Sequence, residues 1–412
     1  MRSADPHHPL ESDASPVSIS PIAPLRRCKA EARIAPGSAK KDNASMSKAP
    51  GDIELLPELY AGWIDALLGG LIPRERRATC NACAMCRPDG GPARSDERYF
   101  DPTAKCCTYT PGLPNFLVGQ ILADDDPATA HGRATVKRRI EARLAVTPLE
   151  LGLPPGYARL YDNASEAFGR SRALRCPHYV EAEGRCGIWR HREAVCATWF
   201  CKHVRGEVGY AFWRDALLRL LNAVEDALAK WCVLEVEIGA DALAELSRAP
   251  AWTGRPGPLT AAALDLEPDE AAHGRIWGNW RGREDEFYRL CGERVRSLDW
   301  DEALALAGPE GRALALLTRR AYERLTSNTL AEALVTGEMQ ISGMSPETTR
   351  VVTYSENDPL DIPNLVLALL PTFDGRPMAE AVAAIAERTG ITLGTDLLRK
   401  LADFGVLKPP TR

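Results

Sequence analysis

Nine of the twelve cysteines in this 412-residue chain fall in two groups, and thiols spaced in this way can hold metal ions. The first group lies within residues 80–107 and the second within residues 176–201. Thiolate sulfur is a soft ligand that suits zinc and iron–sulfur clusters. The predicted metal ligands are Cys80, Cys83, Cys86, Cys106, Cys107, Cys176, Cys186, Cys196 and Cys201.

The spacing of these thiols favours more than one metal ion. Cys80, Cys83 and Cys86 form a C-x-x-C-x-x-C run, which is closer to cluster-binding spacing than to a single zinc knuckle. The adjacent pair Cys106 and Cys107 can serve one ion or bridge two sites. The second group supplies four thiols, the number that a structural zinc site requires. Nine thiols therefore fit two four-ligand sites with one thiol to spare, or one larger multinuclear site.

The cysteine pattern over residues 75–205 resembles the YkgJ family of cysteine-cluster proteins, which is described as zinc- or iron-chelating. The resemblance implies metal binding by the nine cysteines and implies no particular reaction. Nineteen residues separate Cys86 from Cys106, where family members keep the run compact, and Glu193 stands where a proline usually follows the arginine. Beyond the first group, the matching residues are Cys176 with Pro177, Cys186 with Ile188, Trp189 and Arg192, then Cys196 and Cys201.

Three histidines lie within or beside the second group. We expect His178, His191 and His203 to support the ligands or lie at the surface, and direct binding to the metal is the alternative. Three further cysteines are isolated in the sequence. The helical surroundings of Cys232 favour a place in the core, and the other two are Cys28 and Cys291.

Basic residues exceed acidic residues around the second group. Residues 131–205 contain fourteen Lys and Arg against seven Asp and Glu, although the whole chain has a formal net charge of only -5. The surplus could attract nucleic acid, or it could offset the charge of about -2 that four thiolates keep around one Zn²⁺. We favour the second explanation, because no stripe of basic and aromatic residues accompanies the surplus.

Helical periodicity is the main structural signal outside the cysteine groups. It is strongest over residues 210–232, where apolar residues recur on one face. On the helix predicted at 267–297, Trp277, Trp280 and Phe287 could form a binding face, but a core of packed helices is favoured. Further helices are predicted at 53–71, from Pro114 onward, and at 128–145, 299–307 (capped by Ser297 or Asp299) and 309–337.

The last seventy residues show a different pattern of predicted elements, with one short strand followed by short helices. The strand is predicted at 351–355, and the helices at 365–370, 378–389 and 395–404, with Gly375 and Gly390 at helix ends. Residues 351–407 resemble the winged-helix modules of the PqqD type, which bind leader peptides of ribosomally made peptide products. The resemblance implies a peptide or protein partner, bound by strand addition, and packing on the helical region is the alternative. Nucleic acid is not expected, because residues 345–412 contain nine acidic and seven basic residues.

The predicted fold is mainly α, with a loop-rich cysteine-cluster metal domain, a helical region and a small winged-helix-like module at the C-terminus. The corresponding boundaries are a disordered tail at 1–50, the metal domain with flanking helices at 51–235, the helical region at 236–340 and the module at 345–412. Met46 is a candidate for the true start of the chain.

The predicted function is binding of zinc or iron, iron–sulfur clusters included, in a structural or accessory role. The alternative is an iron-dependent enzyme that modifies a peptide or protein held by the C-terminal module, an idea that a distant likeness to flagellin lysine N-methylases supports. No side chain can be assigned a catalytic role, since no base, nucleophile or nucleotide loop is evident. No apolar run or leader pattern suggests a membrane or export, so we expect a cytoplasmic protein, in which clustered cysteines are ligands more often than disulfides.

Overall fold

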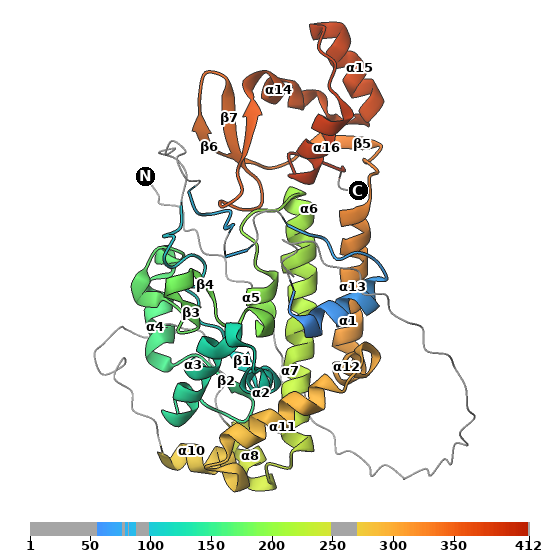
Figure 1. Ribbon diagram of the computed structural model, residues 1–412. Coiled ribbons are helices and arrows are strands. Elements are labelled where there is room, and N and C mark those ends of the chain that lie inside the picture. The colour runs from blue at the N-terminus through green and yellow to red at the C-terminus, as the bar shows by residue number, and fades with distance from the viewer. Residues whose placement is uncertain (1–55, 76–78, 81, 88–98, 249–269, 411–412) are drawn as a thin grey trace, which may run out of the picture. The chain divides into compact units, whose positions relative to one another are not determined.

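The computed structural model describes residues 56–75, 79–80, 82–87, 99–248 and 270–410. The chain separates into two units, Met1–Asp52 and Ile53–Arg412, and all the described residues belong to the second unit. The fold is mainly helical, as predicted (Figure 1). The predicted disordered tail, Met46 and Cys28 lie outside the described residues. Within the described part, no helix is both long and apolar enough to cross a lipid bilayer.

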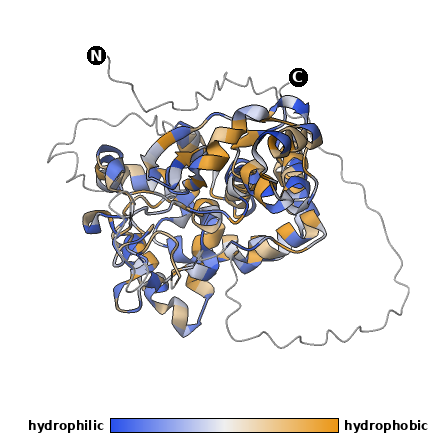
Figure 2. Ribbon diagram, turned by 90° about the horizontal axis from the view of Figure 1, so that it is seen from above, coloured by the Kyte–Doolittle hydropathy of each residue, from blue (hydrophilic) through white to orange (hydrophobic). Residues whose placement is uncertain are grey.

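The larger of two hydrophobic cores is built around helix α7 (Leu218–Glu235), which continues α6 (Gly206–Tyr210) and a π-helical stretch, Ala211–Leu217. Leu220, Leu221 and Val224 of α7 are fully buried. Figure 2 shows hydrophobic positions concentrated where the helices lie together. The other helices of this part are α1 (Glu58–Leu68), α2 (Asn115–Ala123), α3 (Ala130–Glu141), α8 (Ala240–Arg248), α10 (Glu270–Trp277), α11 (Glu284–Arg296), α12 (Trp300–Leu306) and α13 (Gly308–Thr326).

Helices α2 and α11 cross at unusually short range because glycine occupies the crossing point on each helix. A Cβ at position 119 would lie 1.8 Å from the carbonyl oxygen of Tyr288, and one at position 292 would lie 2.9 Å from the amide nitrogen of Gln120. Any larger residue at position 119 would force the helices apart. The close crossing holds α2 in the core at the point where the chain leaves the first cysteine group.

Most helix predictions are confirmed, but two predicted helices are too long. The predicted helix 267–297 is broken into α10 and α11, because Gly278 and Gly282 adopt positive φ angles of 48° and 81° in the turn between them. The predicted helix 309–337 ends at Thr326, and Ala333–Thr336 is strand β5.

Three finer predictions about the helical part are confirmed. Asp299 caps α12 in a capping box with Glu302. Trp277 and Phe287 are fully buried, as the core interpretation requires, and so is Cys232, whereas Trp280 is half-buried and packs against the same core. The aromatic residues of α10 and α11 therefore contribute to packing and not to an exposed face.

The cysteine region, residues 79–205, is built from short elements and turns. Its strands are two residues long: β3 (Tyr179–Val180) and β4 (Arg185–Cys186) form a hairpin, whereas β1 (Leu113–Pro114) pairs antiparallel with β2 (Glu150–Leu151) across α2 and α3. Helix α4 (Pro155–Asn163) and the short α5 (Ala194–Thr198) accompany them, together with α2, α3 and several 3₁₀ turns.

The C-terminal module, residues 333–408, has a hydrophobic core of its own. Its two antiparallel sheets have the strand orders β6-β7-β8 and β10-β5-β9. The helices lie close to their predicted positions, but of the strands only β7 was predicted, and Gly375 lies in β9 instead of at a helix end. The elements are β5, β6 (Gln340–Met344), β7 (Thr348–Val352), β8 (Leu360–Pro363), α14 (Asn364–Leu369), β9 (Asp374–Pro377), α15 (Met378–Thr389), α16 (Thr395–Asp403) and β10 (Leu407–Lys408).

Candidate metal centre

The backbone brings the two cysteine groups together. The amide of Cys176 donates a 2.7 Å hydrogen bond to the carbonyl of Cys107, which joins the second group to the first. The β3–β4 hairpin then turns the chain back, so that Cys186 pairs with Tyr179, three residues beyond Cys176. Because of this hairpin, two thiols ten residues apart in the sequence face the same space.

Local turns place the remaining thiols. The amide of Cys86 donates to the carbonyl of Cys83 at 3.2 Å, which closes the tight turn expected of C-x-x-C spacing. The Glu193 carboxylate accepts hydrogen bonds from the amides of Val195 and Cys196, at 2.6 and 2.8 Å, and so caps the N-terminus of α5. This cap fixes Cys196 in the first turn of the helix. Glu193, which departs from the family pattern, thus has a structural reason to be there.

Eight of the nine predicted ligands line two adjoining cavities, which we call the thiol chamber. The larger cavity, of about 150 Å³, is lined by Cys80, Cys106, Cys107, Cys176, Cys186 and Cys196. The smaller, of about 70 Å³, is lined by Cys80, Cys83, Cys106, Cys196 and Cys201. Three thiols face both cavities, so the two form one continuous site. Cys86 is not among the residues that line either cavity.

Aromatic side chains form much of the remaining wall of the larger cavity. Tyr109 packs against Tyr161 with ring centroids 5.7 Å apart, and Phe168 packs against Trp199 at the same distance. The guanidinium of Arg214 lies 3.4 Å from the centroid of the Trp199 ring. An apolar wall of this kind excludes water and strengthens every electrostatic interaction of the thiols.

Burial keeps most of the chamber thiols protonated at neutral pH. It raises the pKa of Cys176 to about 11 and the pKa of Cys186 and Cys201 to about 12. It also raises the pKa of Cys196 well above the ordinary value of a thiol. A metal ion that binds these sulfurs must therefore displace their protons.

Two thiols have lowered pKa values because neighbouring thiols donate hydrogen bonds to them. The Cys86 thiol lowers the pKa of Cys83 to about 6, and the Cys107 thiol lowers the pKa of Cys106. The thiolate is the form that binds metal. Cys83 and Cys106 are therefore the thiols most readily deprotonated for binding a metal ion. Cys86 contributes by its hydrogen bond to Cys83.

Three cations lie near the thiols, of which Arg139 and Arg192 are buried and Lys105 is half-buried. Arg192 lies against Trp189, with the guanidinium carbon 3.5 Å from the ring centroid, and donates at 3.1 Å to the carbonyl of Cys196. Lys105 donates at 2.7 Å to the carbonyl of Cys80. Arg139 is buried, interacts electrostatically with Cys176, and has two guanidinium nitrogens without a hydrogen-bond partner among the described residues. These charges favour the thiolate form and offset the negative charge of a thiolate-bound metal.

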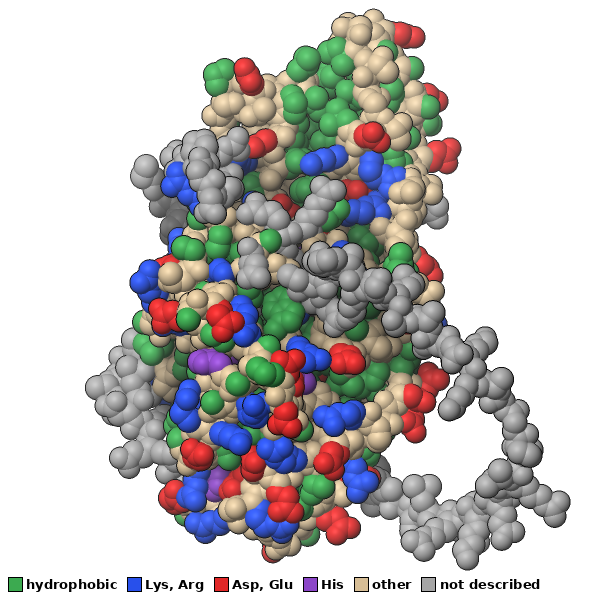
Figure 3. All heavy atoms as spheres, in the orientation of Figure 1, with side chains coloured by type: hydrophobic (Ala, Val, Ile, Leu, Met, Phe, Trp, Pro, Cys, Tyr) green, Lys and Arg blue, Asp and Glu red, His purple; other side chains and the backbone are tan. Residues whose placement is uncertain are grey.

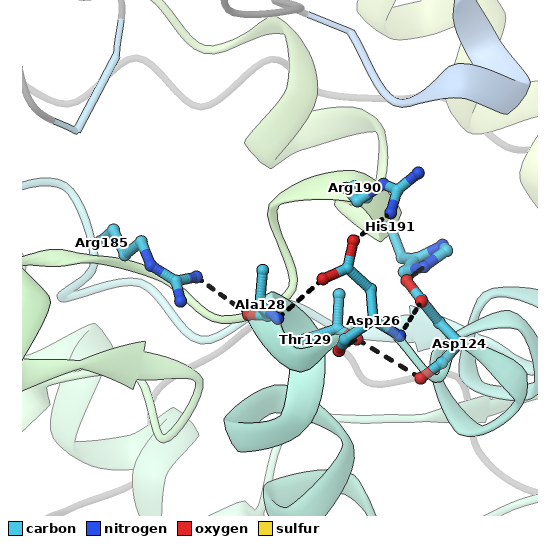
Figure 4. Close-up of polar contacts among 7 residues, drawn as sticks. All are labelled: Asp124, Asp126, Ala128, Thr129, Arg185, Arg190 and His191. Carbon is cyan, nitrogen blue, oxygen red and sulfur yellow. Dashed lines mark hydrogen bonds and ion pairs between the residues drawn. The ribbon is translucent and has the colours of Figure 1, made fainter.

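Several basic residues of the region make surface ion pairs. Figure 4 shows Arg190 paired with Asp126 at 2.8 Å and Arg185 donating to the carbonyl of Ala128. On the face shown in Figure 3, basic and acidic side chains are interspersed over the lower half. Part of the basic surplus noted in the sequence is thus paired at the surface, and part is buried around the chamber.

The three histidines of the region line neither cavity of the chamber. Nε2 of His191 lies 2.7 Å from Asp124 in the contact drawn in Figure 4. Nδ1 of His178 lies 2.7 Å from the Thr135 hydroxyl, and the ring of His203 packs against two tyrosines. In the described part of the chain, no three His, Cys, Asp or Glu side chains are grouped so as to hold one metal ion. The thiols surround a volume and do not converge on a single point.

Comparison with known proteins found no family model, curated protein or solved structure that matches the chain. The likeness to the cysteine-cluster family therefore remains a prediction from the sequence pattern. What supports the site is the geometry of the thiols and of the charges around them.

Sequence reasoning missed several residues that line the chamber or, like Arg139, lie near one of its thiols. Lys105 directly precedes the cysteine pair, and a basic residue next to ligands is a signal that could have identified it. Arg139, Tyr161 and Phe168 carry no such signal, because they come from segments without cysteines. Only the packing of α3, α4 and the following turn brings them to the site.

Proposed function

We propose that this protein binds a multinuclear centre of zinc or iron, iron–sulfur clusters included, in the thiol chamber. The observation that carries the proposal is the convergence of eight thiols on two adjoining cavities that share Cys80, Cys106 and Cys196. Thiols spread around a volume suit several metal ions, or a cluster, better than one tetrahedral zinc ion. Buried Arg192 and half-buried Lys105 supply positive charge that such a centre requires.

The metal has a structural role in this proposal. The strands of the cysteine region are two residues long, and 3₁₀ turns and short helices make up much of the rest. Metal bonds would hold these short elements together, as they do in other small thiolate sites. Cys86 then serves as a hydrogen-bond donor to Cys83 instead of a ligand.

The first test is elemental analysis of protein purified without oxygen, together with its visible spectrum. We expect more than one metal ion per chain. The variant Cys196→Ser should lose most of the metal because Cys196 faces both cavities. The matched control is Cys232→Ser, which changes a buried thiol of α7 outside the chamber and should keep the metal. Equal metal contents in the two variants, or a wild-type chain without zinc or iron, would refute the proposal.

A second candidate function is modification of a bound peptide or protein by an iron centre, and a specific cavity favours it. This cavity, of about 290 Å³, lies between Ile341 and Ser342 of β6 and residues beside the ligands. Ala84, Met85 and Lys202 line both this cavity and the smaller cavity of the thiol chamber. A peptide bound against a winged-helix-like module would thus lie next to the centre.

The two functions require different metals. The enzymatic proposal needs a redox-capable centre, so a coloured protein that contains iron and labile sulfide would favour it. A colourless protein that contains only zinc would exclude it and leave the structural role.

A further inference from the structure

The residues that follow Cys201 are held by the C-terminal module. The amide of His203 donates at 2.9 Å to Asp358, in the loop between β7 and β8. Two nitrogens of Arg205 donate to the two carboxylate oxygens of Asp403 in α16, at 2.9 and 2.6 Å. We call residues 203–207 the ligand-side segment, since they begin two residues beyond a predicted metal ligand.

Further contacts bind the same segment. The ammonium of Lys408 donates to the Glu207 carboxylate at 2.9 Å. Gly206 has a positive φ of 50°, and a Cβ at this position would lie 2.7 Å from the Phe404 ring and 2.8 Å from the carbonyl oxygen of Asp403. The module therefore approaches the backbone so closely that only glycine fits, and the segment has little freedom to shift alone.

The segment is also anchored to the chain that leads into the first cysteine group. Buried Glu75 accepts a hydrogen bond from the amide of Val204, and its other oxygen accepts one at 3.0 Å from the indole of Trp213. The ligand-side segment is thus clamped between residues near the first cysteines and the C-terminal module.

The clamp includes an ion pair between Arg205 and Asp403. It is bidentate, and the side chains are only 20% and 13% exposed, so solvent screens the interaction weakly. Arg205 also donates at 2.9 Å to the carbonyl of Ser327, which fixes the guanidinium between the helical part and the module. A comparable pair in the same module, Asp374 with Arg376, is far more exposed, at 48% and 43%.

We propose that the C-terminal module positions Cys201 for metal binding through the Arg205–Asp403 pair, an inference that rests on the proposed metal-binding function. Groups that orient a ligand contribute to metal affinity without touching the metal. Cys83 and Cys201 face only the smaller cavity, whereas Cys107, Cys176 and Cys186 face only the larger one. The module therefore acts on the part of the centre in the smaller cavity.

The test loads the reduced full-length chain with Zn²⁺ and follows release of the metal to a chromogenic chelator. In Asp403→Asn, we expect one fraction of the metal to leave about 10-fold faster than in wild type, in line with the effect of losing a ligand-orienting partner. The remaining fraction should leave at the wild-type rate. The control Asp374→Asn removes the exposed ion pair of the same module and should leave both rates unchanged.

A charge exchange separates positioning from a general loss of stability. The double variant Arg205→Asp with Asp403→Arg restores an ion pair with reversed polarity but not the hydrogen bond from residue 205 to Ser327, so it should restore the slow release in part. If metal left Asp403→Asn at the wild-type rate, the positioning role of the module would be overturned, but the proposed metal-binding function would not. Faster release of all the metal, without rescue by the double variant, would also overturn the positioning role, because the module would then support only the overall fold. A wild-type chain without thiol-bound Zn²⁺ would overturn the proposed function as well.

Discussion

The cysteine region and the helical core around α7 are stabilised in different ways. In the core, consecutive turns of α7 bury Leu220, Leu221, Val224 and Leu228 completely, and removal of apolar surface from water supplies the free energy. In the cysteine region, short strands and 3₁₀ turns carry mostly half-buried thiols together with buried cations and a buried carboxylate. Buried polar groups favour folding only when they are paired or bind a ligand. We therefore expect the core to form without a ligand, whereas the proposed function predicts that the chamber depends on one.

Removal of the metal should show the largest difference between the two regions. We expect a strong chelator to unfold residues 79–205 and to leave the α7 core folded, because thiolate–metal bonds can contribute on the order of 10 kcal/mol to a small site. Hydrogen exchange measured by mass spectrometry would show the loss of protection in one region only. In Cys196→Ser, which is expected to lack most of the metal already, the chelator should change hydrogen exchange little further. Unaltered exchange in residues 79–205 after metal removal would contradict the dependence on a ligand.

A substitution that creates a cavity in the helical core should have the opposite effect: it should destabilise the core and leave the metal centre unchanged. Leu221→Ala removes a fully buried side chain of α7, and we expect the free energy of unfolding to fall by about 2–5 kcal/mol. The metal content under native conditions should stay the same. Leu234→Ala on the same helix is the matched control, because Leu234 is 59% exposed and should cost less than about 0.5 kcal/mol. Equal destabilisation by the two variants, measured by denaturant unfolding, would disprove this assignment.

A buried carboxylate at the boundary of the two regions should make stability depend on pH. Glu225 of α7 accepts hydrogen bonds from the Tyr60 hydroxyl and, at 2.8 Å, from the amide of Ala194. Burial, followed by the nearby charge of Glu193, raises the pKa of Glu225 from 4.5 to about 8. The folded state then binds more protons than the unfolded state. Stability should be full below pH 4.5 and fall as the pH rises towards 8, by at most about 1.4 kcal/mol per pH unit.

The variant Glu225→Gln isolates this effect. Glutamine keeps the carbonyl oxygen that accepts both hydrogen bonds and cannot ionise, so its unfolding free energy should vary less between pH 5 and pH 8. Denaturant unfolding of both proteins over this range would measure the difference. Parallel pH profiles would mean that Glu225 does not carry the dependence.

The smallest expected effects come from removing two helix caps, one in each region, which form a closely matched pair. Asp299 caps α12 in the helical part, so Asp299→Ala should cost about 1 kcal/mol in unfolding free energy and leave the metal content unchanged. Glu193 caps α5 inside the chamber and holds the amide of Cys196. Glu193→Ala should therefore reduce the metal content as well as the stability. If both substitutions left the bound metal unchanged, Glu193 would be a cap and nothing more.

Much of the helical part could be predicted from residue periodicity. The apolar face over residues 210–232 and the capping residue Asp299 are local signals, and the structure agrees with both. The predicted long helix at 267–297 is broken because glycines at 278 and 282 allow a tight turn. Its apolar pattern continues on both sides of the turn, because α10 and α11 bury their faces in the same core.

The strands of the C-terminal module could not be predicted in the same way. Strand β5 pairs with β10, about seventy residues later in the chain, and with β9. These strands are only two to four residues long, too short for alternation to show in the sequence. Their pairing depends on packing that forms only when distant segments meet.

The cysteine types and spacings alone predicted nine candidate ligands, since clustered thiols have few other roles in such a pattern, and eight of these residues line the chamber. Which thiols share a cavity was decided only by the tertiary structure. The β3–β4 hairpin, the cap of α5 and the bond between Cys176 and Cys107 set that grouping. The same holds for Arg139 and for the clamp on residues 203–207, whose partners are distant in sequence. Distances between such residues depend on how separate segments pack, and a local pattern carries no information about that packing.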